Sequence, residues 1–407
     1  MKSDLFGNKI DYAMLSALSK IKRGSTMVEK KPLTRFGEFE FLKALAIIGL
    51  PLIHVTEQAI DYGFATPGLK SVGYGIIGLC IVGPSVFMIC MGFGIGGGKL
   101  SAAAIRRNGI QFLLIGAILN LLRWLLPGIV QHLAIGSRLI EDVDACFMSD
   151  IYYFVGFFFL FYSVLKKWKV TSYQLLLISI ITLTINNMLT PVMQKFVTNS
   201  TAAAIIGNII YVDKYSAFPL LSWAIFPTVG IILGEILKKN TDEFHEVFMK
   251  RMMGFSIVFF GVFVFFLWNY KIDVLKVLVS PNNDYITDLP NVMMLIAVAG
   301  FLLGITYYLC KAIGHTGFMA YMLKISTFII PFYLLQWIII SWIFYGMMIA
   351  GAPKACFGVV PYIICVVGIT AICIYVASHH GMKIMKMLTK ITSFKNKPKK
   401  GGKHVEK

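Results

Sequence analysis

Charged residues are scarce in this chain of 407 amino acids, because Asp, Glu, Lys and Arg together make up only 14% of it. Soluble domains carry roughly 25% charged residues. Here 57% of the residues are hydrophobic and the mean hydropathy is +0.75. A chain this apolar cannot bury its hydrophobic side chains in one core and still present a polar surface to water. The composition excludes a soluble globular protein and predicts an integral membrane protein.

The sequence also lacks the cysteine patterns that form disulfides or bind metals. None of its seven cysteines belongs to a CxxC pair, and most lie inside apolar runs, where cysteine packs as a small hydrophobic residue. We therefore expect neither a disulfide framework nor a metal cofactor. The segment 1–38 has no apolar core and no small-residue cleavage site, so no signal peptide is predicted.

Acidic residues are few as well, with 20 Asp and Glu against 38 Lys and Arg, which gives a formal net charge of +18. The basic residues gather in short runs between apolar segments. This distribution is typical of cytoplasmic loops of membrane proteins and unlike a single basic surface for nucleic acid. We therefore expect the lipid bilayer, and no nucleic acid, among the partners of this chain.

Apolar stretches of about 20 residues, long enough to cross the hydrocarbon layer of a bilayer, recur along the chain. A shorter apolar piece, 202–211, is interpreted as a re-entrant or surface-lying segment. The fold class predicted is all-α, a polytopic membrane protein of ten helices. The predicted spans are 41–60, 73–97, 109–129, 147–165, 171–190, 216–237, 253–270, 292–312, 325–347 and 357–378.

The loops between these spans alternate in charge, with KLSAAAIRRN, KKWKV and KKNTDEFHEVFMKR on one side and acidic or less basic loops on the other. One missed helix would reverse every later loop, so the alternation supports ten spans with both termini in the cytoplasm. We predict a multi-pass protein of the cell membrane. It has a basic cytoplasmic segment over 1–38, a membrane domain over 39–380 and a lysine-rich cytoplasmic tail over 381–407.

Polar residues at membrane depth are costly, and the first span carries the most informative set. Lys43 and His54 are eleven residues apart, which is about three helical turns and about 16 Å along the axis. Glu40 and Glu57 each lie three residues away on the same face, and Pro51 can bend the helix near the histidine. The four residues predict one polar face. As an isolated pair, Lys43 and His54 would instead suggest an interface anchor and a hydrogen-bonded core residue.

This first span, RFGEFEFLKALAIIGLPLIH, resembles the opening signature of the transmembrane acyltransferase superfamily, in which an acidic residue is followed by Arg and then His. Here Glu40 replaces the usual Asp and Lys43 the usual Arg. Three later segments resemble the heparan-α-glucosaminide N-acetyltransferase-like branch more than the family 3 acyltransferases. They are GPSVFMICMGFGIGGG, SDIYYFVGFFFLF and FPLLSWAIFPTVGIILGEILKK, and the likeness covers roughly two-thirds of the chain.

The resemblance implies an enzyme that moves an acyl group, usually acetyl from cytoplasmic acetyl-CoA, to a carbohydrate or cell-envelope acceptor. It implies catalytic roles for His54, Lys43, Glu57 and Asp150. Histidine can act as the base that activates the acceptor or can carry the acyl group itself, and the sequence leaves both open. Glu57 either orients the histidine ring or is a solvated helix-end carboxylate. Asp150 either caps the fourth membrane helix or makes a polar contact in the site.

Coenzyme A carries phosphates, so positive charge is expected where the donor enters. The residues predicted to bind it lie at the cytoplasmic edge: Lys99, Arg106, Arg107, Gly96, Gly97 and Gly98. Exposed backbone N–H groups of a glycine run can hold a phosphate. The same glycines can instead allow close helix packing, and the arginines can simply obey the charge rule for cytoplasmic loops. Arg123, beside Trp124, is interpreted as an interface anchor.

Two other functions are consistent with the sequence. A transporter or flippase of a polar or lipid-linked solute would place the polar face along its path, although the chain shows no internal repeat of the kind on which many transporters are built. An inactive acyltransferase-like scaffold is the second, because the ammonium group of Lys43 cannot bind a phosphate bidentately as arginine does. The sequence leaves a homo-oligomer open and does not identify the acceptor.

Overall fold

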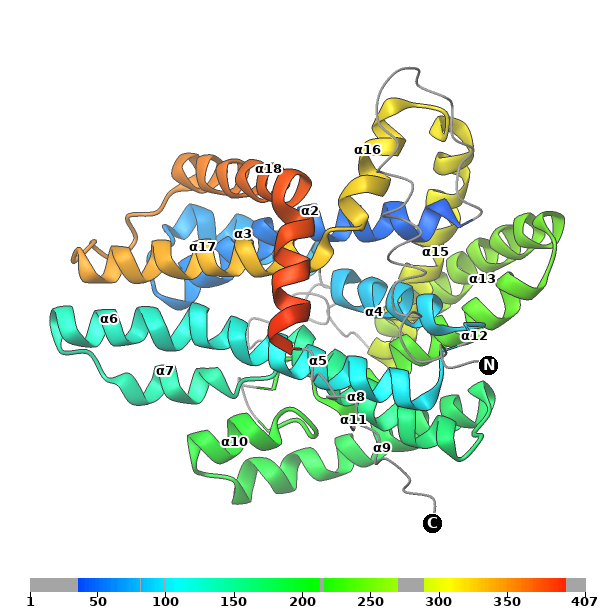
Figure 1. The fold of residues 1–407 in the computed structure, drawn as a ribbon, viewed down its shortest axis with the longest axis horizontal. Helices are drawn as coiled ribbons and strands as arrows, with labels where there is room; N and C mark the ends of the chain where they lie inside the picture. The colour runs from blue at the N-terminus through cyan, green and yellow to red at the C-terminus, as the bar shows by residue number, and fades with distance from the viewer. Residues whose placement is uncertain (1–35, 81, 99, 213–215, 270–288, 393–407) are drawn as a thin grey trace, which may run out of the picture.

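The computed structural model describes residues 36–80, 82–98, 100–212, 216–269 and 289–392 of the chain. The described segments fold into helices joined by short loops (Figure 1). The helices are α2 Gly37–Asp61, α3 Pro67–Cys80, α4 Val82–Ile95, α5 Ala102–Asn120, the π-helix η1 Leu121–Leu125, α6 Leu126–Ile135, α7 Leu139–Cys146, α8 Ile151–Lys167, α9 Ser172–Phe196, α10 Ser200–Ile206, α11 Leu220–Trp223, α12 Ile225–Lys239, α13 Asp242–Asn269, α15 Leu289–Ile313, α16 Gly317–Ser326, α17 Ile329–Ile349 and α18 Val359–Thr392.

The predicted all-α membrane fold is confirmed, because ten helical segments in the described part of the chain are long and apolar enough to cross a bilayer. The third and the tenth exceed their predicted lengths by the largest margins. The third runs over 102–135 as α5, η1 and α6, and the tenth, α18, continues to Thr392. The extra turns of α18 are rich in Lys and Met, and these residues have high helix propensity in water as well. Of the predicted terminal segments, residues 1–35 and 393–407 lie outside the described residues.

Several helices begin where a side chain satisfies the free backbone N–H groups of the first turn. Ser101 caps α5 by accepting a hydrogen bond from the Ala104 N–H. Thr171 and Gln174 form a capping box at the start of α9. The short helix α10 begins at an Asn199 cap and packs against α7, where the sequence predicts a segment too short to span.

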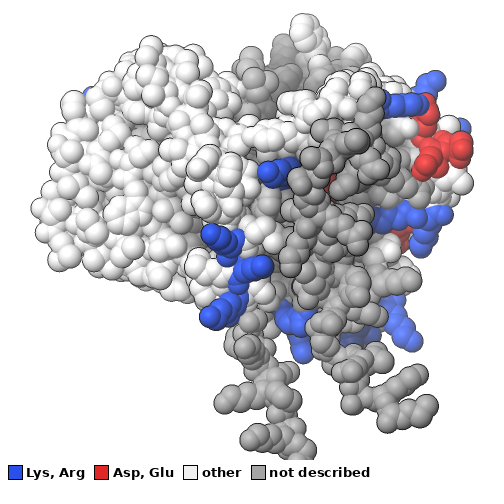
Figure 2. Space-filling view, turned by 45° about the horizontal axis from the view of Figure 1, so that its top comes forward, with Lys and Arg blue, Asp and Glu red and all other residues white. Residues whose placement is uncertain are grey.

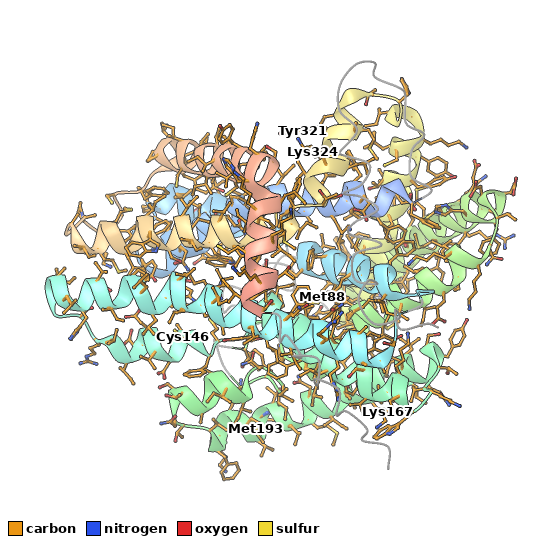
Figure 3. All side chains as sticks on the ribbon, in the orientation of Figure 1. Met88, Cys146, Lys167, Met193, Tyr321 and Lys324 are labelled. Atoms are coloured by element: carbon orange, nitrogen blue, oxygen red, sulfur yellow. The ribbon has the colours of Figure 1, made fainter. Side chains whose placement is uncertain are left out.

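The first membrane helix, α2, packs against helices from both the early and the late part of the chain. It contacts α3, α4, α15, α16, α17 and α18. The membrane helices run mainly along the long axis, and Lys and Arg gather toward one end of that axis on the face shown in Figure 2. Lys167, in the basic last turn of α8, lies toward this end, and Cys146, at the end of α7, lies away from it (Figure 3).

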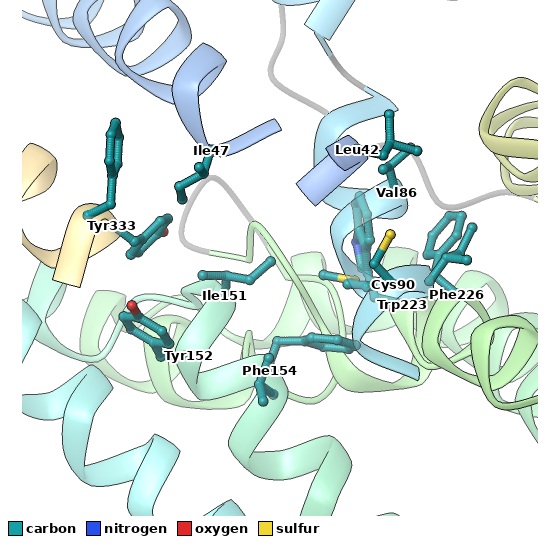
Figure 4. Close-up of a cluster of buried hydrophobic side chains, with 14 of the residues drawn as sticks. Leu42, Ile47, Val86, Cys90, Ile151, Tyr152, Phe154, Trp223, Phe226 and Tyr333 are labelled. Carbon is teal, nitrogen blue, oxygen red and sulfur yellow. The ribbon is translucent and has the colours of Figure 1, made fainter. Parts of the chain in front are cut away.

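Close helix packing depends on glycine where α4 meets α12. A Cβ added at Gly92 would lie 2.0 Å from the backbone oxygen of Pro227, and one at Gly230 would lie 2.0 Å from that of Ile89. The two backbones therefore meet directly, as small residues allow between membrane helices. Figure 4 shows the adjoining core, in which Cys90 of α4 lies near Trp223 and Phe226.

Candidate functional site

His54 lies on α2, within one turn of Pro51, and only 9% of its surface is exposed. Its ring stacks on Trp337 of α17, with the ring centroids 4.0 Å apart and the planes at 26°. Tyr333, one turn earlier on α17, meets the same ring edge-on at 6.1 Å. Gln336 of α17, which is fully buried, also lies beside the histidine. The membrane-depth histidine is therefore held in an aromatic pocket between two spans.

Arg123 brings a buried positive charge to the same place. Its Nη2 lies 3.0 Å from Asp150 Oδ2, and its Nε donates to Asn120 Oδ1 at 2.9 Å. The guanidinium lies 4.6 Å from the centroid of the Trp337 ring, the ring on which His54 stacks. Arg123 is 1% exposed and so is not the interface anchor suggested by the sequence. Its carboxylate partner explains how a charge is tolerated at this depth.

A π-helical turn places Arg123 in the interior. Within η1 the backbone N–H of Leu126 donates to the carbonyl of Leu121, five residues earlier. Pro127 follows, and its missing N–H leaves the carbonyl of Arg123 without an α-helical partner, which favours a local departure from regular helix. Arg123 and the adjacent Trp124 are both buried as a result.

Asp150 combines the two roles that the sequence left open. Its Oδ1 accepts from the backbone N–H of Tyr152 at 2.8 Å, which caps α8. Its Oδ2 is paired with Arg123 and also accepts from the hydroxyl of Tyr333 at 2.8 Å. Asp150 thus joins the start of α8 to η1 and to α17. Figure 4 shows Tyr152 and Tyr333 lying close together beside this junction.

A cavity of about 830 Å³ connects this cluster to the surface. Its lining includes His54, Arg123 and Asp150, which are buried, and extends to Asp61 and Glu141, which are exposed. The cavity therefore opens toward the end of the molecule where α2 finishes. Glu57, predicted to assist the histidine, lines it as well.

Several buried donors in the cavity wall have no hydrogen-bond partner among the residues that the structure describes. They are Nη1 of Arg123 and Nε1 of Trp124 and Trp337. Nδ1 of His54 also has none within those residues. Because buried polar groups are normally paired, unpaired donors around one cavity favour a bound ligand with acceptor oxygens.

Lys43 lies away from this cluster. Its ammonium pairs with Glu40 at 2.7 Å, and Glu40 also accepts from Ser326 of α16 at 2.7 Å. The cavity lining on α2 begins only at Ala46. The polar face of α2 is therefore divided into two parts. Glu40 and Lys43 form an ion pair that is bound to α16, whereas His54 and Glu57 line the cavity.

The structure does not bring the residues predicted to bind coenzyme A to His54. Arg106 and Arg107 are exposed on α5 and do not line the cavity, and Lys99 lies outside the described residues. The backbone N–H groups of Gly96 and Gly98 donate to carbonyls within the same chain segment. Gly97 has a φ of +66° at the end of α4.

The glycine run is instead engaged by α12. A Cβ at Gly96 would lie 2.2 Å from the backbone oxygen of Ile231. Lys238 Nζ donates to the carbonyls of Phe93, Gly94 and Gly96 and so satisfies the end of α4. These contacts favour the helix-packing interpretation of the glycines.

Tyr333 and Trp337 were not predicted from the sequence as site residues, and Arg123 is buried in the site and not at the interface. The sequence signal for Arg123 was a charged residue close to the end of an apolar span. The same signal is typical of an interface anchor, so it did not identify a buried site residue. Among the described residues, no three His, Cys, Asp or Glu side chains are grouped to hold a metal ion. No protein-family model matches the chain, and searches of curated proteins and of solved structures give no match either.

Proposed function

We propose that the protein is a membrane-bound acyltransferase in which His54 promotes transfer of an acyl group, acetyl in the simplest case, from acyl-CoA to a carbohydrate or cell-envelope acceptor. One observation carries the proposal. His54 lines the cavity beside Arg123, whose position is fixed by Asp150. A base and a preorganised cation at one cavity wall are the groups that acyl transfer requires.

The chemistry follows from these groups. His54 takes the proton of the acceptor hydroxyl or amine as that atom attacks the thioester carbonyl carbon. The oxyanion that forms is stabilised by the unpaired N–H groups of Arg123 and Trp337. When the carbon–sulfur bond breaks, the imidazolium returns the proton to the departing thiolate. The same imidazole can also accept the acyl group first and pass it on in a second step.

Access to His54 differs between the two ends of the cavity. The opening beside Asp61 lies at the end that the loop charges predict to be external, which suits an acceptor from the envelope. On the other side of His54, Phe39 of α2 stacks on Phe93 of α4 with centroids 3.7 Å apart. A cytoplasmic donor therefore requires α2 and α4 to separate near these rings.

The decisive experiment is an acyl-transfer assay on the protein in lipid nanodiscs. With acetyl-CoA present, we expect release of the free CoA thiol and loss of that release in His54→Ala. His380→Ala is the matched control, because His380 is exposed on α18 and is expected to retain turnover. Equal turnover by His54→Ala and the native protein would contradict the catalytic role of His54.

A solute transporter is the second candidate, because the cavity reaches the buried charges from one end while the first turns of α2 are packed. That arrangement is expected of one state of an alternating-access protein. It predicts solute flux in proteoliposomes without consumption of thioester. Absence of flux, of turnover and of acyl-CoA binding would instead favour a membrane scaffold.

A further inference from the structure

The outer part of the cavity, between His54 and the surface, is acidic in a protein of net charge +18. Glu57 and Asp61 of α2 line it together with Glu141 and Asp142 of α7. Including Arg123 with its partner Asp150, the whole cavity is lined by five carboxylates and two guanidinium groups. The second guanidinium, Arg138, is exposed. Ligands of positive charge are therefore favoured in the outer part and anionic ligands are disfavoured.

Aromatic rings line the same part of the cavity. Tyr345 of α17 lies 6.0 Å from Tyr62 and 6.5 Å from Trp124, measured between ring centroids. The Tyr345 hydroxyl donates to Asp142, so a carboxylate and a group of rings are joined in one wall. Ring faces attract cations in addition to the attraction of the carboxylates.

Gln58 gives an independent indication of a ligand. It lines the cavity and is 5% exposed, and its Oε1 has no hydrogen-bond partner among the described residues. Asp61, three residues later, is the last residue of α2, and Tyr62 follows it with helical backbone angles, which places both on the same face as Gln58. A buried carbonyl oxygen without a donor beside carboxylates and rings fits an N–H donor that carries positive charge.

We infer that the outer cavity is a binding subsite for a primary ammonium group of the ligand that reaches His54. The ammonium donates to Gln58 Oε1 and to the carboxylates and lies against the rings of Tyr62 and Tyr345. In these surroundings the amine keeps its proton and has no lone pair for attack. It therefore anchors the ligand, and a different group of the same molecule reacts at His54. The reaction of that other group at His54 rests on the proposed acyl transfer, whereas the binding of the ammonium group does not.

The subsite is tested by binding of butylammonium to the protein in nanodiscs, followed through the fluorescence of the tryptophans. The matched probe is 1-butanol, which has the same chain without the charge. We expect saturable binding of the amine, at least about tenfold tighter than that of the alcohol, and weaker binding at high salt. Equal affinities, or no saturable binding of the amine, would overturn the inference.

Variants assign the site within the chain. Glu57→Gln with Asp61→Asn removes two carboxylates at little change in shape and is expected to weaken amine binding about tenfold. Gln58→Leu removes the acceptor and provides a second, uncharged test. Glu246→Gln, at an exposed pair with Lys311, is expected to change nothing. Unchanged amine affinity in both cavity variants would contradict the inference.

The readouts separate this inference from the proposed function. His54→Ala is expected to abolish thioester turnover while leaving the affinity for butylammonium intact. Amine binding that depends on the carboxylates, in a protein without turnover, would support the subsite and reject the enzyme. Turnover without amine binding would reject the subsite and support the enzyme.

Discussion

At the residue scale, the ion pair of Arg123 and Asp150 has the strongest consequences. Both side chains are at most 3% exposed, so neither charge is solvated by water. Asp150 also receives the Tyr333 hydroxyl and caps α8, which spreads its bonds over three elements. Such a pair contributes little to stability as a whole, but removing one partner leaves the other charge buried and unpaired.

We predict that Asp150→Asn lowers the free energy of unfolding by about 3–5 kcal/mol. The amide oxygen can still cap α8, so the loss reports the charge rather than the cap. The double variant Arg123→Met with Asp150→Asn is expected to recover much of that loss. Thermal unfolding in nanodiscs measures all three proteins.

The exposed pair of Lys311 and Glu246 supplies the control for this cycle. Its N–O distance is also 3.0 Å, but both side chains are about half exposed. Glu246→Gln is therefore expected to leave stability unchanged, since water screens an exposed pair. A double variant that is no more stable than Asp150→Asn alone would contradict the prediction that the unpaired Arg123 charge causes the loss.

At the element scale, the contact of α4 with α12 is the least tolerant of substitution. A methyl group at Gly92 or Gly230 would meet a backbone oxygen at 2.0 Å, and a backbone cannot move aside as a flexible side chain can. Lys238 ties the same two helices at the end of α4. Helices α4 and α12 therefore form one packed unit, which contacts α2 through α4.

We predict that Gly92→Ala lowers the free energy of unfolding by about 1–3 kcal/mol or more, as expected of overpacking. Gly94→Ala is the matched control in the same helix, because its Cβ would meet nothing within 4 Å. There the better helix propensity of alanine is expected to leave stability equal or slightly higher. Equal losses for the two variants would show that helix propensity, and not the contact, decides.

Elements were predicted better than the site. Hydropathy and loop charge depend on runs of residues, so ten spans follow from the sequence even where single ends are wrong. The location of Arg123 depends on one π-helical turn. Pro127 indicates a departure from regular helix there, but the local sequence does not show which side chain that departure turns into the interior. Trp337 and Tyr333 were missed because aromatic residues in an apolar span usually face lipid or core. Their contacts with His54 arise only from the packing of α17 on α2.

At the scale of the whole molecule, the direction of the chain in the membrane decides what the cavity can bind. Lys354, in the loop between α17 and α18, donates to the carbonyl of Tyr62, which lines the cavity. Phe357 pairs with Ala65 through the backbone. The loop between α17 and α18 therefore lies on the same side as the cavity opening, and the orientation of one fixes that of the other.

The loop charges predict that this side is external, and the cysteines of the chain allow a direct test. Cys356, in the loop between α17 and α18, is exposed. A membrane-impermeant maleimide applied to intact cells is expected to label the native protein, and Cys356→Ser should remove that signal.

His315, exposed between α15 and α16 at the opposite end of α17, provides the second site. In the Cys356→Ser background, His315→Cys should react only after the membrane is opened. The reverse pattern would place the acidic opening of the cavity in the cytoplasm. There the carboxylates of the cavity would repel the phosphates of acyl-CoA, and the assignment of donor and acceptor sides would fail.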